Sequence, residues 1–159
     1  SLEGKKLTFI GDGNNMANSL IVGCIKCGME VAIACPDNYK PDSDIIAWAE
    51  QNGRFTCTSD IMAAAKGADV LYTDVWASMG QEGEAAKRRI AFEGYQINAD
   101  VCAQANDGVM VLHCLPAHKG EEITADVFEA HANEIFDEAE NRMHTIKAVM
   151  LATLGEPEK

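Results

Sequence analysis

A glycine-rich turn with two consecutive amides is the first segment of the chain that could bind a ligand. Residues 11–19 read GDGNNMANS and follow a short apolar run, which indicates a strand that turns directly into a helix. The free N–H groups at a helix start suit an anion. The side chains of Asn14 and Asn15 could hold a carboxylate without a charge of their own. The alternative is that either amide only caps the helix through an Asx turn.

An acid followed by a Ser-Met-Gly loop ends another apolar run. The segment DVWASMGQE begins at Asp74, where a carboxylate at a strand tip can bind an ammonium group. Ser78 and Met79 lie in the loop beyond it, and Gly80 is a place where that loop could hinge. Taken singly, Asp74 also fits a turn residue, and Ser78 also fits the N-cap of a helix that begins near Glu82.

A cysteine beside a histidine ends a further apolar run. The segment HCLPAH begins at His113, so Cys114 could be a nucleophile. Successive side chains of a strand point to opposite faces, however, so His113 is badly placed to act as its base. We therefore predict that Cys114 lines a pocket and that His113 has a structural role.

An arginine among acids precedes the last apolar stretch of the chain. The segment DEAENRMH begins at Asp137 and contains Arg142. In a compact domain Arg142 could reach the same edge of the sheet as the other three segments. The alternative is an exposed ion pair of little energetic value.

Elements that alternate between two periodicities must position these segments. Short β-branched runs alternate with longer stretches of helical periodicity, which is typical of βαβ units. The predicted strands are residues 6–10, 30–34, 54–58, 70–73 and 109–113. The predicted helices are residues 15–27, 43–52, 60–66, 82–92, 98–105 and 138–154, the first followed by Gly28 as C′ residue.

The predicted fold class is α/β, a three-layer, doubly wound and mostly parallel five-stranded sheet of the Rossmann-like kind. Right-handed crossovers favour this arrangement, and it collects functional loops at the carboxyl ends of the strands. We find no repeat, linker or low-complexity tract, so residues 1–159 are expected to form one domain.

Composition excludes two classes of partner. The 13 Lys and Arg against 25 Asp and Glu give a formal charge of −12, which repels nucleic acid and anionic membrane surfaces. The longest apolar stretches fall far short of the roughly 20 residues that cross a bilayer. We therefore expect a soluble protein without nucleic-acid or membrane partners.

The six cysteines lie mostly inside apolar segments, which favours a reducing, intracellular compartment. Cys24 and Cys27 form a C-x-x-C within a predicted helix rather than at its N-terminus, which argues against a redox or zinc site. The chain opens at Ser1 with neither an initiator Met nor a signal segment, so we expect it to begin between domains.

Taken together and in order, the segments resemble the second, ornithine-binding domain of ornithine carbamoyltransferases over nearly the whole chain. The match is carried by GDGNN at 11–15, DVWASMG at 74–80, HCLPAH at 113–118 and EAENR at 138–142, with a weaker match over 92–98. The D-x-x-x-S-M-G loop separates the ornithine enzymes from aspartate carbamoyltransferases.

The resemblance implies that the δ-amino group of L-ornithine attacks the carbonyl carbon of carbamoyl phosphate, giving citrulline and phosphate. It implies no metal or organic cofactor, a place in arginine biosynthesis or the urea cycle, and homotrimers or higher oligomers. It also implies a cytoplasmic location, or the mitochondrial matrix in a eukaryote.

Residue by residue, the resemblance implies a substrate site. Asn15 would bind the ornithine carboxylate, while Asp74 and Ser78 would bind its α-amino group. The Met79 backbone would help to close the loop over the substrate. An amide at one end and an acid at the other suit a zwitterion.

The resemblance also implies the reacting end of the site, with Asp74, Cys114 and Arg142 as the catalytic residues. Cys114 would orient the neutral δ-amino group without forming a covalent bond. The Leu115 carbonyl and Arg142 would contact the carbamoyl moiety, and the Leu115–Pro116 peptide is expected to be cis. Catalysis would be mostly orientation and charge stabilisation.

Two signatures of the family's carbamoyl phosphate domain, Ser-Thr-Arg-Thr and His-Pro-x-Gln, occur nowhere in the 159 residues. The carbamoyl phosphate-binding domain is therefore expected to be absent from this chain. Without the groups that cradle the phosphate, the isolated chain should lack activity.

Three alternatives remain open. The first is a transcarbamoylase for another amine, such as putrescine or an acylated ornithine. The second is a nucleotide-binding Rossmann module, although Met16 replaces the third glycine of its fingerprint. The third is a non-catalytic interaction domain, with an uncovered apolar surface on the last helix. The residues of that surface, which could equally belong to the domain's own core, are Ile146, Val149, Met150 and Leu154.

Overall fold

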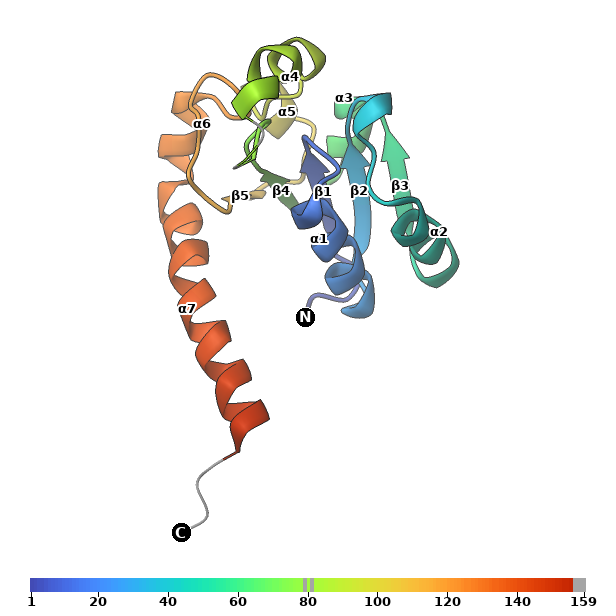
Figure 1. The fold of residues 1–159 in the computed structure, drawn as a ribbon, viewed down its shortest axis with the longest axis vertical. Coiled ribbons are helices and arrows are strands. Elements are labelled where there is room, and N and C mark those ends of the chain that lie inside the picture. The colour runs from blue at the N-terminus through green and yellow to red at the C-terminus, as the bar shows by residue number, and fades with distance from the viewer. Residues whose placement is uncertain (79, 81, 156–159) are drawn as a thin grey trace.

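One five-stranded parallel sheet lies between two layers of helices in the computed structural model, which describes residues 1–78, 80 and 82–155 (Figure 1). The strand order is β3-β2-β1-β4-β5, and every neighbouring pair is parallel. The strands are β1 (Lys6–Ile10), β2 (Glu30–Ala34), β3 (Phe55–Thr58), β4 (Val70–Thr73) and β5 (Met110–His113). The predicted α/β class and doubly wound parallel sheet are confirmed.

Seven α-helices and two 3-10 turns connect and cover the strands in the part of the chain that the structure describes. The helices are α1 (Asn15–Lys26), α2 (Ser43–Asn52), α3 (Ile61–Ala65), α4 (Ala85–Ala91), α5 (Ala99–Cys102), α6 (Ala125–Ala130) and α7 (Ala132–Leu154). The 3-10 turns are η1 (Asp37–Tyr39) and η2 (Glu82–Glu84).

The predicted elements differ from the observed ones mainly in the second half of the chain. The helix predicted over residues 98–105 ends at Cys102, because i→i+3 bonds at Gln104 and Ala105 continue it as turns. The helix predicted over residues 82–92 begins as the 3-10 turn η2, which contains Gly83, a poor helix former. Helix α6 was not predicted, since six residues give too little periodicity.

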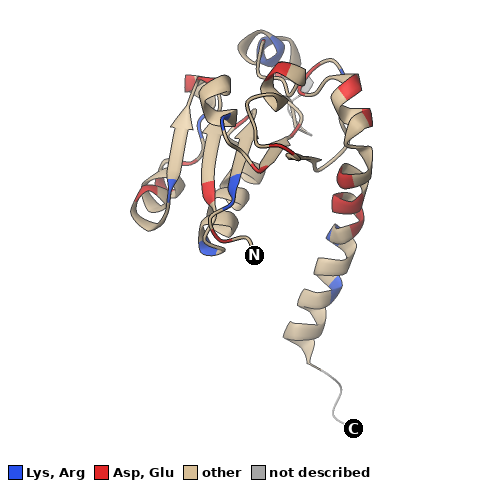
Figure 2. Ribbon diagram, turned by 180° about the vertical axis from the view of Figure 1, so that it is seen from behind, with Lys and Arg blue, Asp and Glu red and all other residues tan. Residues whose placement is uncertain are grey.

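The last helix begins earlier than predicted. The sequence placed its start near residue 138, whereas α7 begins at Ala132. The first turns of α7 carry acids rather than a regular apolar stripe (Figure 2), so periodicity does not reveal them. Arg142 lies inside the helix, as the predicted range 138–154 also has it.

The alternation of side chains along each strand divides the core between two sheet faces. In β1, Leu7 and Phe9 pack with Ile21 of α1, whereas Ile10 packs in the opposite cluster. That second cluster contains Val101 of α5 and residues of α3 and α6. A sheet covered on both faces holds its strand ends in fixed positions, which a binding site at those ends requires.

Helix α7 extends beyond the sheet, and its last turns project away from the rest of the chain (Figure 1). The apolar residues predicted to form either an uncovered surface or part of the core, Ile146, Val149, Met150 and Leu154, are 52%, 60%, 53% and 78% exposed. They are therefore not part of the core of this chain. None of the described helices combines the length and apolarity needed to cross a bilayer.

Candidate functional site

The strand order reverses between β1 and β4, and the candidate site lies at the carboxyl ends of these two strands. Strand β1 is followed by Gly11 and the turn into α1. Its neighbour in the sheet, β4, is followed directly by Asp74. In doubly wound sheets, ligands bind in the crevice outside such a reversal, because successive connections leave for opposite faces there.

Asn14 joins the start of α1 to the end of β4. Its Oδ1 accepts hydrogen bonds from the backbone N–H groups of Met16 at 2.9 Å and Ala17 at 3.3 Å, so it is the N-cap of α1. Its Nδ2 donates to Asp74 Oδ2 at 3.1 Å. Capping orients the Asn14 amide, and the oriented amide holds the Asp74 carboxylate.

Asp74 is the centre of the site and is only 8% exposed. Its Oδ1 accepts from the Val75 N–H at 2.8 Å and from the Cys114 thiol at 3.1 Å, while Oδ2 accepts from Asn14. Each carboxylate oxygen can accept about two hydrogen bonds. Among the described residues, Oδ2 thus keeps one position at which an ammonium group could bind.

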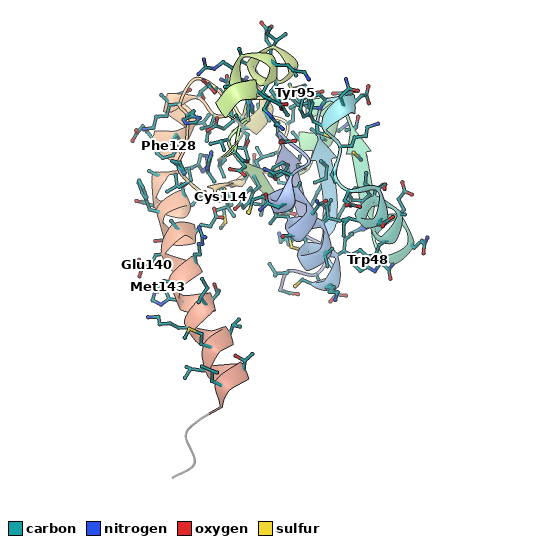
Figure 3. The ribbon with its side chains drawn as sticks, viewed as in Figure 1. Trp48, Tyr95, Cys114, Phe128, Glu140 and Met143 are labelled. Carbon is teal, nitrogen blue, oxygen red and sulfur yellow. The ribbon has the colours of Figure 1, made fainter. Side chains whose placement is uncertain are left out.

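Cys114 follows β5 and is labelled in Figure 3 at the carboxyl edge of the sheet. Burial, and then its hydrogen bond to Asp74, raise the pKa of the Cys114 thiol to about 12. At neutral pH the group is therefore a thiol that donates to Asp74, and a nucleophilic thiolate is disfavoured. The role of Cys114 as a pocket-lining residue stays a prediction.

His113 points to the other face of the sheet, as the alternation of β5 predicts. Its Nε2 lies 3.1 Å from Glu122 Oε1, and its Nδ1 accepts from the Leu115 N–H at 2.9 Å. Both His113 and Glu122 are fully buried. Glu122 Oε1 also accepts from the His118 N–H at 2.5 Å. The pair therefore shapes the loop after β5, the structural role predicted for His113.

Leu115 turns the chain sharply at the end of β5. Its φ of 57° lies in the left-handed region, which is uncommon for a residue with a β-carbon. The Leu115–Pro116 peptide is cis, as expected. The bond from the Leu115 N–H to His113 helps to fix this conformation.

Helix α7 runs in step with strand β5. Strand β5 is at the edge of the sheet, and its outward N–H groups have no neighbouring strand. The Val111 N–H donates to Glu134 at 3.0 Å, and the His113 N–H donates to Glu138 at 3.0 Å. Four helical residues and two strand residues both advance roughly 6 to 7 Å, which keeps the two elements in register.

Arg142 lies one helical turn beyond Glu138 on α7. Glu138 links α7 to two strands. It accepts a hydrogen bond from the His113 N–H of β5 and another from the Tyr72 hydroxyl of β4. Burial and that bond raise the pKa of Tyr72, so the phenol remains the donor. The Arg142 side chain is exposed and lines an open hollow of about 440 Å³ along one face of α7.

Asn15 and Ser78 lie around the same edge. Asn15 is exposed at the first position of α1, next to Asn14, and its side chain makes no hydrogen bond to the described residues. Ser78 is half-buried in the loop after β4. Met79 lies outside the described residues. The structure thus brings Asn14, Asp74 and Cys114 into contact.

Gly13 explains why the turn resembles a dinucleotide fingerprint only in part. A β-carbon at Gly13 would lie 2.2 Å from the Pro41 nitrogen and 2.3 Å from the Lys40 carbonyl carbon. In a dinucleotide fold the second glycine lets the backbone approach a pyrophosphate. Here the segment that approaches Gly13 closely is the chain's own loop at Lys40 and Pro41 and not a ligand. This disfavours the alternative of a nucleotide-binding module.

Two supporting residues escaped the sequence analysis. Glu138 was noted only as part of a motif, although it ties α7 to both β4 and β5. Arg88 stands in a charged run that looks solvent-exposed, yet it is buried beside Asp12. One feature of the sequence indicates that Arg88 is buried. It stands four residues before the apolar Phe92, which places both on one helix face.

The chain belongs to the aspartate/ornithine carbamoyltransferase family, since residues 3–153 match its Asp/Orn binding domain. The similar proteins have more specific names than the family has, and they are ornithine carbamoyltransferases. The chain is 48% identical over 160 residues to the ornithine carbamoyltransferase of Pyrococcus abyssi, covering 98% of this chain and 50% of that protein. It is 51% identical over 158 residues to the ornithine carbamoyltransferase of Synechocystis sp., covering 97% of this chain and 51% of that protein.

Solved structures give the same result. The ornithine carbamoyltransferase of Pyrococcus furiosus superposes with a TM-score of 0.87 at 47% identity, over 95% of this chain and 50% of that chain. The anabolic enzyme of Campylobacter jejuni superposes with a TM-score of 0.88 at 39% identity, over 92% of this chain and 50% of that chain. The chain spans about half the length of the curated relatives it matches.

Proposed function

We propose that this chain is the L-ornithine-binding domain of an ornithine carbamoyltransferase, with residues 1–159 forming that single domain. The observation that carries the proposal is the arrangement around Asp74. A buried carboxylate at the reversal of strand order holds Asn14 on one side and Cys114 on the other, and keeps an acceptor position on Oδ2. An amino acid with two amino groups needs such an acid in a confined polar pocket.

In the proposed site, Asp74 and Ser78 bind the α-amino group of ornithine, and the Met79 backbone has the role of helping to close the loop over the substrate. Asn15 at the start of α1 binds the carboxylate through its exposed amide. The helix N-terminus favours the same negative charge. Putrescine has neither a carboxylate for Asn15 nor an α-amino group for Asp74, so the amino acid is the preferred substrate.

The proposed reaction forms a bond from the δ-nitrogen of ornithine to the carbonyl carbon of carbamoyl phosphate. The bond from that carbon to the phosphate oxygen breaks, and the nitrogen loses a proton. Cys114 stays a thiol and orients the δ-amino group. The Leu115 carbonyl and Arg142, which lies one helical turn beyond Glu138 on α7, contact the carbamoyl group.

We infer that activity requires a second half that binds carbamoyl phosphate. The family's signatures for that ligand are missing from the sequence, and the relatives are about twice as long as this chain. Assembly into homotrimers or larger oligomers and a cytoplasmic location belong to the same proposal. No cofactor, metal, nucleic acid or membrane takes part in it.

Calorimetric titration of the chain with L-ornithine tests the proposal, with putrescine and NAD as comparison ligands. We expect weak binding selective for ornithine and its loss in Asp74→Asn, which keeps the size of the side chain and removes its charge. Asp44→Asn is the matched control, because Asp44 is an exposed residue in the first turn of α2. Binding of NAD in place of ornithine would contradict the proposal.

A fusion tests the catalytic part. This chain, joined to the first half of the Pyrococcus furiosus enzyme, should form citrulline from ornithine and carbamoyl phosphate, whereas the isolated chain should form none. Arg142→Ala in the fusion should lower turnover and leave the folding midpoint unchanged, because the Arg142 side chain is exposed. Parental turnover in Arg142→Ala would remove this residue from the site.

A further inference from the structure

Arg88 is a buried arginine that bonds to two loops of the candidate site at once. It lies on α4 and is only 6% exposed. Its Nη1 donates to Asp12 Oδ2 at 2.6 Å and to the Trp76 carbonyl oxygen at 2.9 Å. Asp12 belongs to the turn after β1, and Trp76 belongs to the loop after β4.

The contacts of Arg88 extend behind the glycine-rich turn. Its guanidinium carbon lies 5.0 Å from the centre of the Tyr39 ring, and the Tyr39 carbonyl accepts from the Gly13 N–H at 2.8 Å. The other side of Trp76 is also held, since its indole N–H donates to the Tyr95 carbonyl at 3.2 Å. Arg88 thus contacts the glycine-rich turn through Asp12, the loop after β4 through Trp76, and η1 through Tyr39.

The two loops are therefore joined twice. The bond from Asn14 to Asp74 lies at the proposed ligand-binding edge, and the bonds from Arg88 to Asp12 and Trp76 form a second link between the same two loops. Two links between the same loops fix their separation and their rotation, whereas one link leaves a hinge. The proposed ornithine ligands Asn15 and Ser78 stand one on each loop.

A buried ion pair is a poor device for stability alone. Burial, with a smaller contribution from nearby Asp74, raises the pKa of Asp12 even though Arg88 opposes this effect. Well-packed apolar side chains often stabilise a fold as well as such a pair does. What apolar side chains lack is the directed donor to the Trp76 carbonyl.

We propose that Arg88 is a positioning residue for ornithine, which sets the distance between the turn after β1 and the loop after β4. The inference rests on the proposed function of these loops. It adds to that function a residue that touches no substrate and still determines the affinity for it.

The next residue in the chain supplies a matched control. Arg89 has the same charge as Arg88 and lies on the same helix, but its side chain is 65% exposed and pairs with Glu121 at 2.7 Å. Arg88→Met and Arg89→Met therefore change net charge equally. A difference between them reports on the buried contacts of Arg88.

The experiment measures three quantities on the whole chain: the Kd for L-ornithine, the thermal midpoint, and hydrogen exchange of the backbone at residues 11–15 and 74–78. In Arg88→Met we expect the Kd to rise about tenfold, the loss typical of one hydrogen bond to a charged group. Exchange in both segments should accelerate, and the midpoint should fall. Arg89→Met should match the parent in all three.

A double variant separates positioning from folding. Asp12→Asn combined with Arg88→Met removes the uncompensated carboxylate, so the midpoint should recover. The Trp76 carbonyl still lacks its donor, so the weak binding and the fast exchange should persist. Recovery of all three quantities in the double variant would make Arg88 merely structural and overturn the inference.

The outcome also distinguishes this inference from the proposed function. If the parent chain fails to bind ornithine, the proposed function fails in the isolated chain, while the exchange comparison still decides whether Arg88 holds the two loops. Unchanged exchange at residues 74–78 in Arg88→Met would overturn the positioning role whatever the ligand.

Discussion

Asn14 and Asp74 stand 60 positions apart in the chain, and their side chains are joined by a hydrogen bond of 3.1 Å. The same Asn14 side chain caps α1 through its oxygen. One amide therefore performs two tasks, and a substitution can separate them.

Asn14→Ser should preserve the cap and lose the bond to Asp74. Serine is about as good an N-cap as asparagine, so stability should change by less than about 1 kcal/mol. Its shorter side chain cannot reach Asp74, so the affinity for ornithine should fall. Asn98→Ser at the cap of α5 is the control; it should change neither quantity, and an equal loss of affinity there would point to a general effect of capping.

Gly13→Ala should destabilise the fold, whereas Gly23→Ala should not. An alanine at position 13 would force apart the backbone of Lys40 and Pro41, at a cost of about 1 to 3 kcal/mol or more. Gly23 lies within α1 with no atom within 4 Å of an added β-carbon, so alanine should stabilise the helix by up to about 1 kcal/mol. Denaturant unfolding of both variants gives the two free energies, and equal signs would disprove the comparison.

Glu138→Ala should loosen α7 from the sheet. It leaves the Tyr72 hydroxyl and the His113 N–H without their acceptor, which costs roughly 1 to 3 kcal/mol for each buried group that stays unsatisfied. Glu140, on the outer side of α7 in Figure 3, pairs with exposed His144 and with no other of the described residues, so Glu140→Ala should have a small effect. The measurement is the unfolding midpoint in urea; similar midpoints for the two variants would contradict the role of Glu138.

Alkylation should separate the thiols by their pKa. The hydrogen bond from Cys35, 3.9 Å away, and then nearby Lys40 lower the pKa of Cys57 to about 7, whereas that of Cys114 is raised to about 12. Only the thiolate reacts. At pH 8, iodoacetamide should label Cys57 well before Cys114, and labelling of Cys114 should rise with pH toward 12. Mass spectrometry of the peptides checks this, and rapid labelling of Cys114 at pH 8 would restore its candidacy as a nucleophile.

The strands and the site loops could be predicted because their signals are local. The runs that became β1, β2 and β4 are short, apolar and β-branched, and their ends match the prediction. Segments such as 11–15 and 113–118 follow strands directly, so the topology of a parallel sheet brings them to one edge. The alternation of β5 correctly separated His113 from Cys114.

The contacts that hold the site could not be predicted, because they depend on elements far apart in the chain. Glu134 and Glu138 look like solvent-facing acids until α7 is placed along the edge of β5. Arg88 and Arg89 stand side by side in a charged run, where the spacing of Arg88 to Phe92 is a weak signal, and the packing of α4 buries Arg88 alone of the two. Asn14, which the sequence treated like Asn15, takes the bond to Asp74 because it is the N-cap.

The register of hydrogen bonds between α7 and β5 limits where residues can be inserted into the chain or deleted from it. A single residue inserted between Glu138 and Arg142 would rotate Arg142 by roughly 100° about the helix axis relative to Glu138, which bonds to β5. Added residues in the turn between α5 and β5 would leave both elements in place. Insertions and deletions should therefore be tolerated in that turn and excluded from the first half of α7, where spacing matters as much as residue identity.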